Sequence, residues 1–126
     1  EDSIVRGTQL QDKIKALFEI GAREVHMRVA CPPLVFPCIF HNFSTSRSTM
    51  ELASRKAIFE LEGRDTDDLS EYIQDDSEKY QAMVERIRKR IGATSLKYQR
   101  MTDLVDAIGL PIEKLCTHCW DNSSYF

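Results

Sequence analysis

The sequence lacks an apolar run that approaches the roughly 20 residues needed to cross a bilayer, so no membrane-spanning segment is expected. It also lacks an excess of basic residues. The formal net charge is -3, which argues against a large nucleic-acid surface. No secretory signal is recognisable, and there are no internal repeats or low-complexity linkers. We therefore expect a cytoplasmic protein that has neither nucleic acid nor membrane among its partners.

What the sequence does contain is typical of a globular domain. The 126 residues fit a single domain of ordinary size, with 42% hydrophobic and 29% charged residues. The first residue is Glu and not Met, so we expect the chain to derive from a longer or processed protein. Four cysteines could form two disulfides, but without secretory features reduced thiols or metal ligands are favoured.

Hydrophobic periodicity predicts a mostly helical chain. Each expected helix has apolar residues at helical spacing, and most have a plausible cap or stop, such as Thr8, Ser77 and Thr102 at the start or Gly21, Gly63 and Gly92 at the end. The expected helices cover residues 8–20, 46–62, 77–91 and 102–108, with a short helix over 67–75 and one more turn from Pro111 to the segment 116–119.

Two short extended segments are also expected. Residues 24–30 alternate, with Val25, Met27 and Val29 on one face, and Leu96 and Tyr98 alternate in a second piece. Between the first strand and the next helix, residues 31–38 contain three prolines, which exclude a helix or a central strand. We expect this segment to cross the surface in an extended form, with another segment covering its apolar residues.

The opening loop, residues 1–8, is the strongest candidate binding site. Two adjacent carboxylates, Glu1 and Asp2, can accept hydrogen bonds from ribose hydroxyls or bind a divalent metal. Backbone N–H groups around Gly7, at the start of a helix, can bind a phosphate. These residue types in this order suit a phosphorylated sugar.

The string Glu1-Asp2-Ser3-Ile4-Val5-Arg6-Gly7-Thr8 resembles the 5-phosphoribosyl-1-pyrophosphate (PRPP) loop of the type I phosphoribosyltransferases. Within them it is most similar to the glutamine phosphoribosylpyrophosphate amidotransferase (amidophosphoribosyltransferase) family, in which Asp stands at the position of Glu1 and Thr at that of Gln9. The resemblance implies that all eight residues bind PRPP and that Mg²⁺ lies beside Glu1 and Asp2.

The resemblance continues along the chain. Similar segments are Gly21 to Val29, Pro32-Pro33 with Pro37-Cys38, Ile91 to Leu96, Ala107 to Pro111 and Leu115 to Cys119. The chain departs from the family pattern at Phe40-His41-Asn42-Phe43 and after Gly63.

Three cysteines, Cys38, Cys116 and Cys119, match the ligand positions of the iron–sulfur branch of this family, in which four thiolates hold a [4Fe–4S] cluster. The fourth ligand is expected upstream of Glu1, so the chain alone should not complete a cluster. Cys31 matches no ligand position and is interpreted as a buried or free thiol.

Other interpretations of the cysteines remain open. A zinc ion with His118 or His41 as fourth ligand is one alternative. A thioredoxin-like redox pair is disfavoured, because such a pair should open a helix whereas this one is expected to end one. Trp120 and Tyr125 either pack over the cysteine site or belong to a frayed tail.

The resemblance implies a type I phosphoribosyltransferase fold, α/β in the full domain, of which this fragment is mostly α-helical with one or two short strands. Residues 1–45 would be the C-terminal part of the phosphoribosyltransferase domain and residues 46–126 a C-terminal helical region. The full enzyme, a homo-oligomeric glycosyltransferase, would make 5-phosphoribosylamine from PRPP and glutamine-derived ammonia, the first step of de novo purine biosynthesis.

No catalytic residue is expected in this chain, and the fragment alone should be inactive. Two alternatives stand beside this interpretation. One is a non-catalytic metal-binding or interaction module derived from the same segment. The other is a different type I phosphoribosyltransferase, which would share residues 1–8 but would give no reason for the cysteine matches.

Overall fold

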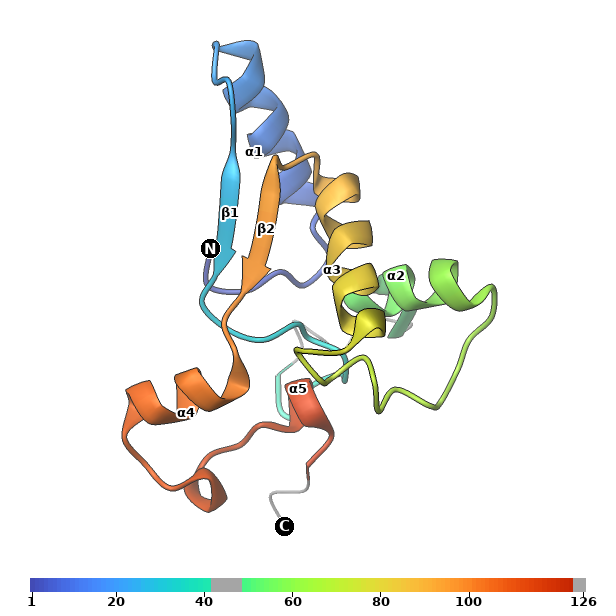
Figure 1. The fold of residues 1–126 in the computed structure, drawn as a ribbon, viewed down its shortest axis with the longest axis vertical. Helices are drawn as coiled ribbons and strands as arrows, with labels where there is room; N and C mark the ends of the chain where they lie inside the picture. Colours follow the sequence, from blue (N-terminus) through green and yellow to red (C-terminus); the bar gives the residue numbers. More distant parts are fainter. Residues whose placement is uncertain (42–48, 124–126) are drawn as a thin grey trace.

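The computed structural model describes residues 1–41 and 49–123, and Figure 1 shows their arrangement. Within these residues the chain is mostly helical around a short two-stranded sheet, as the sequence predicts. The elements in chain order are α1 (Thr8–Glu19), β1 (His26–Val29), the 3₁₀ turn η1 (Thr49–Glu51), α2 (Ala53–Glu62), α3 (Glu78–Ile91), β2 (Ser95–Tyr98), α4 (Met101–Ile108), η2 (Ile112–Lys114) and α5 (His118–Asp121). No helix in the described part of the chain is long and apolar enough to cross a membrane.

The sheet places the start of the chain beside the end of β1. Strands β1 and β2 are parallel, with His26 opposite Ser95 and Val29 opposite Tyr98. On the other edge of β1, the amino group of Glu1 donates to the Arg28 carbonyl (3.2 Å), and the Ala30 N–H donates to the Glu1 carbonyl (3.0 Å). The opening loop therefore leaves from the carboxyl end of β1, where parallel sheets commonly bind ligands.

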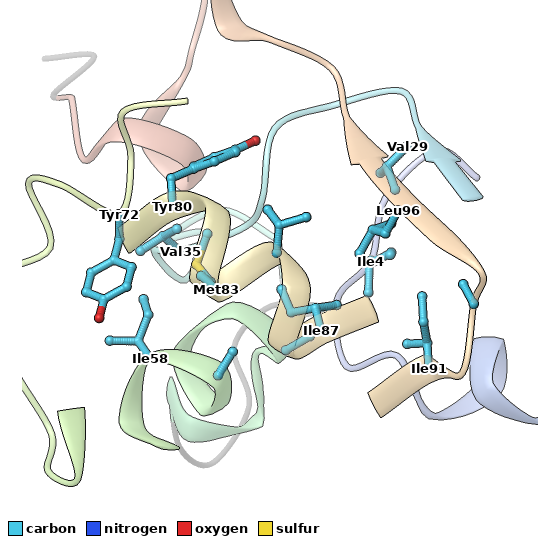
Figure 2. Packing of buried hydrophobic residues seen from close by; sticks show 14 of the residues in the cluster. Ile4, Val29, Val35, Ile58, Tyr72, Tyr80, Met83, Ile87, Ile91 and Leu96 are labelled. Carbon is cyan, nitrogen blue, oxygen red and sulfur yellow. The ribbon is translucent and has the colours of Figure 1, made fainter. Parts of the chain in front are cut away.

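Helix α3 is the centre of the core. The Ser77 side chain accepts a hydrogen bond from the Tyr80 N–H at its start, and Gly92 ends it. Its predicted apolar stripe is buried in full, as Figure 2 shows for several members; the stripe is Tyr80, Met83, Val84, Ile87 and Ile91. Ile4 of the opening loop and Leu96 of β2 pack into the same cluster, so the core joins the opening loop to the second strand.

Two helix starts differ from the sequence prediction. Gly7, in the left-handed conformation, precedes α1, so Thr8 is the first helical residue and not the cap. Helix α4 begins at Met101 after Arg100, and Thr102 lies inside its first turn. In both cases the nearby threonine is a reasonable cap by type, but the backbone turns into the helix earlier.

The expected helix over 46–62 begins later and is interrupted. Residues 46–48 lie outside the described part, and η1 is separated from α2 by Leu52, which is extended (φ -66°, ψ 131°). The Ala53 N–H donates to the Val5 carbonyl at 2.7 Å. This N–H cannot belong to a continuous helix because the opening loop accepts its hydrogen bond.

The short helix expected over 67–75 does not form; this segment is a series of turns. The Asp68 carboxylate accepts hydrogen bonds from the Ser70 N–H (3.4 Å) and hydroxyl (2.8 Å). Such local bonds compete with helical hydrogen bonding, which explains the turn.

The proline-rich crossing is interior and not on the surface, contrary to the sequence prediction. Leu34 and Val35 are buried. The N–H groups of Val35 and Phe36 both donate to the Cys119 carbonyl, at 2.9 and 3.0 Å. The expected covering segment is therefore the C-terminal one, and these bonds bring the cysteine-containing tail against the crossing.

A hydrogen-bond network between Glu62 and the buried Tyr72 gives a prediction about pH. The Tyr72 hydroxyl donates to the Glu62 carboxylate at 2.7 Å, and Lys79 lies 3.1 Å from it. Both interactions favour the charged carboxylate and lower the pKa of Glu62, the Tyr72 hydrogen bond most. Since its folded pKa is depressed, the stability that Glu62 contributes is present above its unfolded pKa and is lost as the pH falls through the folded value.

We therefore expect Tyr72→Phe to raise the pKa of Glu62 toward its ordinary value and to make stability less sensitive to acid. NMR titration of the Glu62 carboxyl carbon measures this. Lys15→Met is the control, because Lys15 pairs with Glu19 on α1, away from Glu62. An unchanged Glu62 titration in Tyr72→Phe would contradict the assignment.

Candidate functional site

The opening loop is fixed at several points along its length. Ile4 is buried in the core, and the Val5 carbonyl accepts the Ala53 N–H. The Arg6 guanidinium lies 3.0 Å from the Glu51 carboxylate, a contact between two half-exposed side chains that adds little stability. Gly7 has φ +82°, a conformation that other residues rarely adopt. These contacts hold the loop in a defined shape.

A pocket of about 520 Å³, called here the loop pocket, lies along this segment. It is lined by every residue of the opening loop except Asp2, together with the next residues of α1; the lining is Glu1, Ser3, Ile4, Val5, Arg6, Gly7, Thr8, Gln9, Leu10 and Lys13. The structure thus brings together seven of the eight residues that the sequence nominated for PRPP.

Two features make the loop pocket suitable for an anion. The first backbone hydrogen bond of α1 runs from the Gln11 N–H to the Gly7 carbonyl (3.0 Å). The preceding N–H groups, of Thr8, Gln9 and Leu10, therefore have no partner within the helix, and they mark its positive end. The lining also includes the cation Lys13.

Sequence reasoning missed Lys13. The available signal was its spacing from Gln9, because residues four apart share one face of a helix. Once α1 is placed at the end of the loop, Lys13 lines the same pocket as the residues whose N–H groups start this helix.

The two carboxylates of the opening loop, Glu1 and Asp2, do not face the same pocket. Glu1 lines the loop pocket, whereas the Asp2 carboxylate accepts a hydrogen bond from the Ser3 N–H at 2.6 Å and does not line it. The charge of Asp2 also contributes to raising the pKa of Cys31. Asp2 therefore lies on the side of the loop that faces the cysteines.

The four cysteines line a second pocket of about 430 Å³, called here the cysteine pocket. Its lining is mostly apolar or sulfur-containing and consists of Ser3, Cys31, Leu34, Cys38, Phe40, His41, Cys116, Cys119 and Trp120. Ser3 lines both pockets, so the opening loop separates them. No disulfide joins these cysteines in the described structure.

Two backbone N–H groups point at Cys38 in the cysteine pocket. Its Sγ accepts hydrogen bonds from the N–H groups of Phe40 (3.4 Å) and His41 (3.3 Å). Burial acts to raise the pKa of the Cys38 thiol, but these two N–H groups and the Cys119 thiol outweigh it, and the net pKa is lowered. The environment of Cys38 therefore favours a thiolate.

Two other thiols are shifted in the opposite direction. Burial, with the nearby Cys38, raises the pKa of Cys119 to about 12. Burial, with the charge of Asp2, raises the pKa of Cys31 to about 11, and the Trp120 side chain partly offsets this. Without a bound cation these two groups are neutral thiols at ordinary pH.

The pocket does not have the geometry of a site for one metal ion. Among residues 1–41 and 49–123, no three His, Cys, Asp or Glu side chains surround a single point at ligand distance. His118, an alternative zinc ligand, has its Nδ1 3.1 Å from the Ser123 carbonyl and its ring 6.3 Å from that of Phe36. The geometry therefore gives no support to the zinc alternative.

The Cys-x-x-Cys segment also differs from its prediction. It does not end a helix: Cys116 precedes α5, and Cys119 lies in the single turn of that helix. Trp120 lines the cysteine pocket, as one interpretation of the tail expected, whereas Tyr125 lies outside the described residues. The indole N–H of Trp120 is buried in this pocket, and its interaction with the Cys31 sulfur is what partly offsets the raised pKa of that thiol.

Comparison with known proteins gives a consistent result. No model of a known protein family matches the chain. Curated relatives do: the amidophosphoribosyltransferase of Methanothermobacter thermautotrophicus is 31% identical over 96% of this chain, and that of Synechococcus elongatus is 36% identical over 96%. The chain spans only about one fifth of the length of these relatives.

A solved structure agrees. The glutamine PRPP amidotransferase from B. subtilis, complexed with ADP and GMP, is similar over the whole of this chain and 23% of its own, with a TM-score of 0.63 and 25% sequence identity. The fold expectation, a mostly helical fragment of a phosphoribosyltransferase-type α/β domain, is confirmed by this match. The resemblance that the opening loop and the cysteines indicate is confirmed as well.

Proposed function

Because the chain corresponds over nearly its whole length to a segment of the amidophosphoribosyltransferases, we propose that it is part of such an enzyme and supplies the loop that binds PRPP. The whole enzyme would transfer ammonia from glutamine to PRPP and make 5-phosphoribosylamine for purine biosynthesis. The proposal includes a cytoplasmic location and a homo-oligomeric enzyme.

The observation that carries this proposal is the loop pocket. It combines the N–H groups at the start of α1, which have no partner within the helix, with the cation Lys13 and the carboxylate of Glu1 in one lining. Phosphate suits the N–H groups and Lys13, and ribose hydroxyls suit the carboxylate. A ligand that carries both phosphate and ribose hydroxyls, as PRPP does, suits both kinds of group in this lining.

Mg²⁺ completes the proposed site. Oxygen ligands are what this ion prefers, and Glu1 and Asp2 supply carboxylates at the point where the loop leaves β1. Glu1 already lines the loop pocket, whereas Asp2 would have to release the Ser3 N–H to bind the same ion. Mg²⁺ would neutralise the charge of the leaving pyrophosphate.

The proposal also includes a [4Fe–4S] cluster in the cysteine pocket, with Cys38, Cys116 and Cys119 as ligands. Thiolates are the required donors, and hydrogen bonds to the ligand sulfur, as at Cys38, are a usual feature of such sites. The cluster would tie the C-terminal segment to the crossing. The two segments are already joined by hydrogen bonds from the crossing to the Cys119 carbonyl.

Titration of the ¹⁵N-labelled chain with PRPP and Mg²⁺ tests the loop pocket. We expect amide shifts to concentrate on residues 3–13, and Thr8→Val to weaken binding several-fold because it removes a hydroxyl donor while keeping the side-chain shape. Thr102→Val is the matched control, since Thr102 is exposed on α4, which is remote from the pocket. Shifts spread over the surface, or equal effects of the two variants, would refute the site.

The chain by itself is expected to be inactive. Incubation with glutamine and PRPP should give no 5-phosphoribosylamine, because the chain spans only a fifth of its relatives and no catalytic residue is assigned in it. Robust turnover by this polypeptide would contradict the prediction.

A further inference from the structure

Arg6 lines two pockets. One is the loop pocket, and the other, called here the α2 pocket, is a space of about 570 Å³ lined by the end of the opening loop and by residues of α1, η1, α2 and α3. Glu51 of η1 lines the α2 pocket but not the loop pocket. The Nε and Nη2 groups of Arg6 each lie 3.0 Å from Oε2 of Glu51. This ion pair therefore directs the guanidinium of Arg6 toward the α2 pocket.

The ion pair between Arg6 and Glu51 is easily exchanged. The two side chains are 52% and 43% exposed, and a pair that is open to water to this extent adds little stability. A phosphate group accepts two parallel hydrogen bonds from a guanidinium, and such charge-assisted bonds are among the strong ones. A phosphate that enters the loop pocket can therefore compete with Glu51 for Arg6.

Only the side chain of Arg6 has to move for this exchange. The backbone is held on one side by the hydrogen bond from the Ala53 N–H to the Val5 carbonyl (2.7 Å). On the other side Gly7 has φ +82°, and its carbonyl accepts the first hydrogen bond of α1. The guanidinium can thus turn from one pocket to the other while the loop keeps its shape.

We propose that Glu51 is a positioning residue for the PRPP site. It holds the guanidinium of Arg6 toward the α2 pocket, and a phosphate group of PRPP takes this guanidinium from it when the ligand binds. The inference rests on the proposed function and deepens it, because it adds a residue outside the opening loop that sets the affinity of the loop pocket for its ligand.

The consequence is a lower affinity than Arg6 could otherwise give. A ligand that must first displace an internal partner loses the free energy of that contact from its binding. Removing the carboxylate of Glu51 should therefore strengthen PRPP binding, whereas removing the guanidinium of Arg6 should weaken it. If Arg6 carries the effect of Glu51, the two changes together should bind PRPP as the Arg6 variant alone does.

Titration of the ¹⁵N-labelled chain with PRPP and Mg²⁺ tests this assignment. We expect Glu51→Gln to tighten binding about twofold to fivefold, the range of an exposed ion pair. Arg6→Gln should weaken binding about tenfold. In the parent chain the Nε–H signal of Arg6 should move as PRPP is added, and in Glu51→Gln it should reach the same end point at a lower ligand concentration.

Glu60→Gln is the matched control. It removes the same charge and takes away the carboxylate that lies 2.6 Å from Arg90, a cation that lines the α2 pocket but not the loop pocket. Its PRPP affinity should equal that of the parent. If the parent binds PRPP and Glu51→Gln binds it no more tightly than Glu60→Gln, the inference is wrong while the proposed function stands. If the parent shows no shifts at the loop pocket, both fail.

Discussion

Replacing Gly7 by Ala is expected to weaken PRPP binding at least tenfold and to destabilise the fold. Gly7 has φ +82°, and an L-residue in the left-handed conformation costs about 1–2 kcal/mol. A Cβ at this position would also lie 3.3 Å from Cγ2 of Ile91, a buried side chain of α3 that has little room to move. The loop would have to shift, and the N–H groups that line the loop pocket would shift with it.

Gly63→Ala separates the cost of the left-handed backbone conformation from the cost of the contact with Ile91. Gly63 has a similar φ of +71°, it ends α2 away from the loop pocket, and a Cβ there would meet nothing within 4 Å. It should therefore lose only the conformational part of the stability and keep full PRPP binding. Urea unfolding measures the stability of each variant, and the ¹⁵N titration measures its PRPP binding. Equal stability losses with unchanged binding in both variants would show that the contact with Ile91 has no role.

Periodicity and caps predicted the parts of the fold that local sequence determines. The stripe of α3 is buried as expected, and Ser77 and Gly92 end the helix, because apolar spacing and capping act over one or two turns. The same reasoning failed at 67–75, where Asp68 binds Ser70, and at Leu52, where the loop carbonyl of Val5 takes the next N–H.

The candidate site depends on contacts that are distant in sequence. The order of residues in the opening loop indicated a sugar phosphate, but not that Asp2 turns toward Ser3 and away from the loop pocket. The position of Lys13 follows only when α1 is placed over the loop. Cys31 joins the other cysteines only because the crossing is interior and the C-terminal segment covers it. Such placements are set by tertiary packing, which no local pattern encodes.

The largest loss of stability is expected from Ile87→Ala. Ile87 is 1% exposed on the inner face of α3. In Figure 2 it lies in the core between Ile4 of the opening loop and Ile58 of α2. Truncating a buried isoleucine removes its transfer free energy and leaves a cavity, which together cost about 2–5 kcal/mol. Since domains of this size are stable by only about 5–15 kcal/mol, the loss is a large share of the total.

Because the core joins the opening loop to α3, we expect this cavity to affect the whole chain and not one half. Urea unfolding monitored by Trp120 fluorescence and by far-ultraviolet circular dichroism should shift together, with a lower midpoint and an unchanged slope. Ile20→Ala is the matched control: Ile20 is 82% exposed, and its truncation should change stability by less than about 0.5 kcal/mol. Separate transitions for the two probes would show that the chain does not unfold as one cooperative unit.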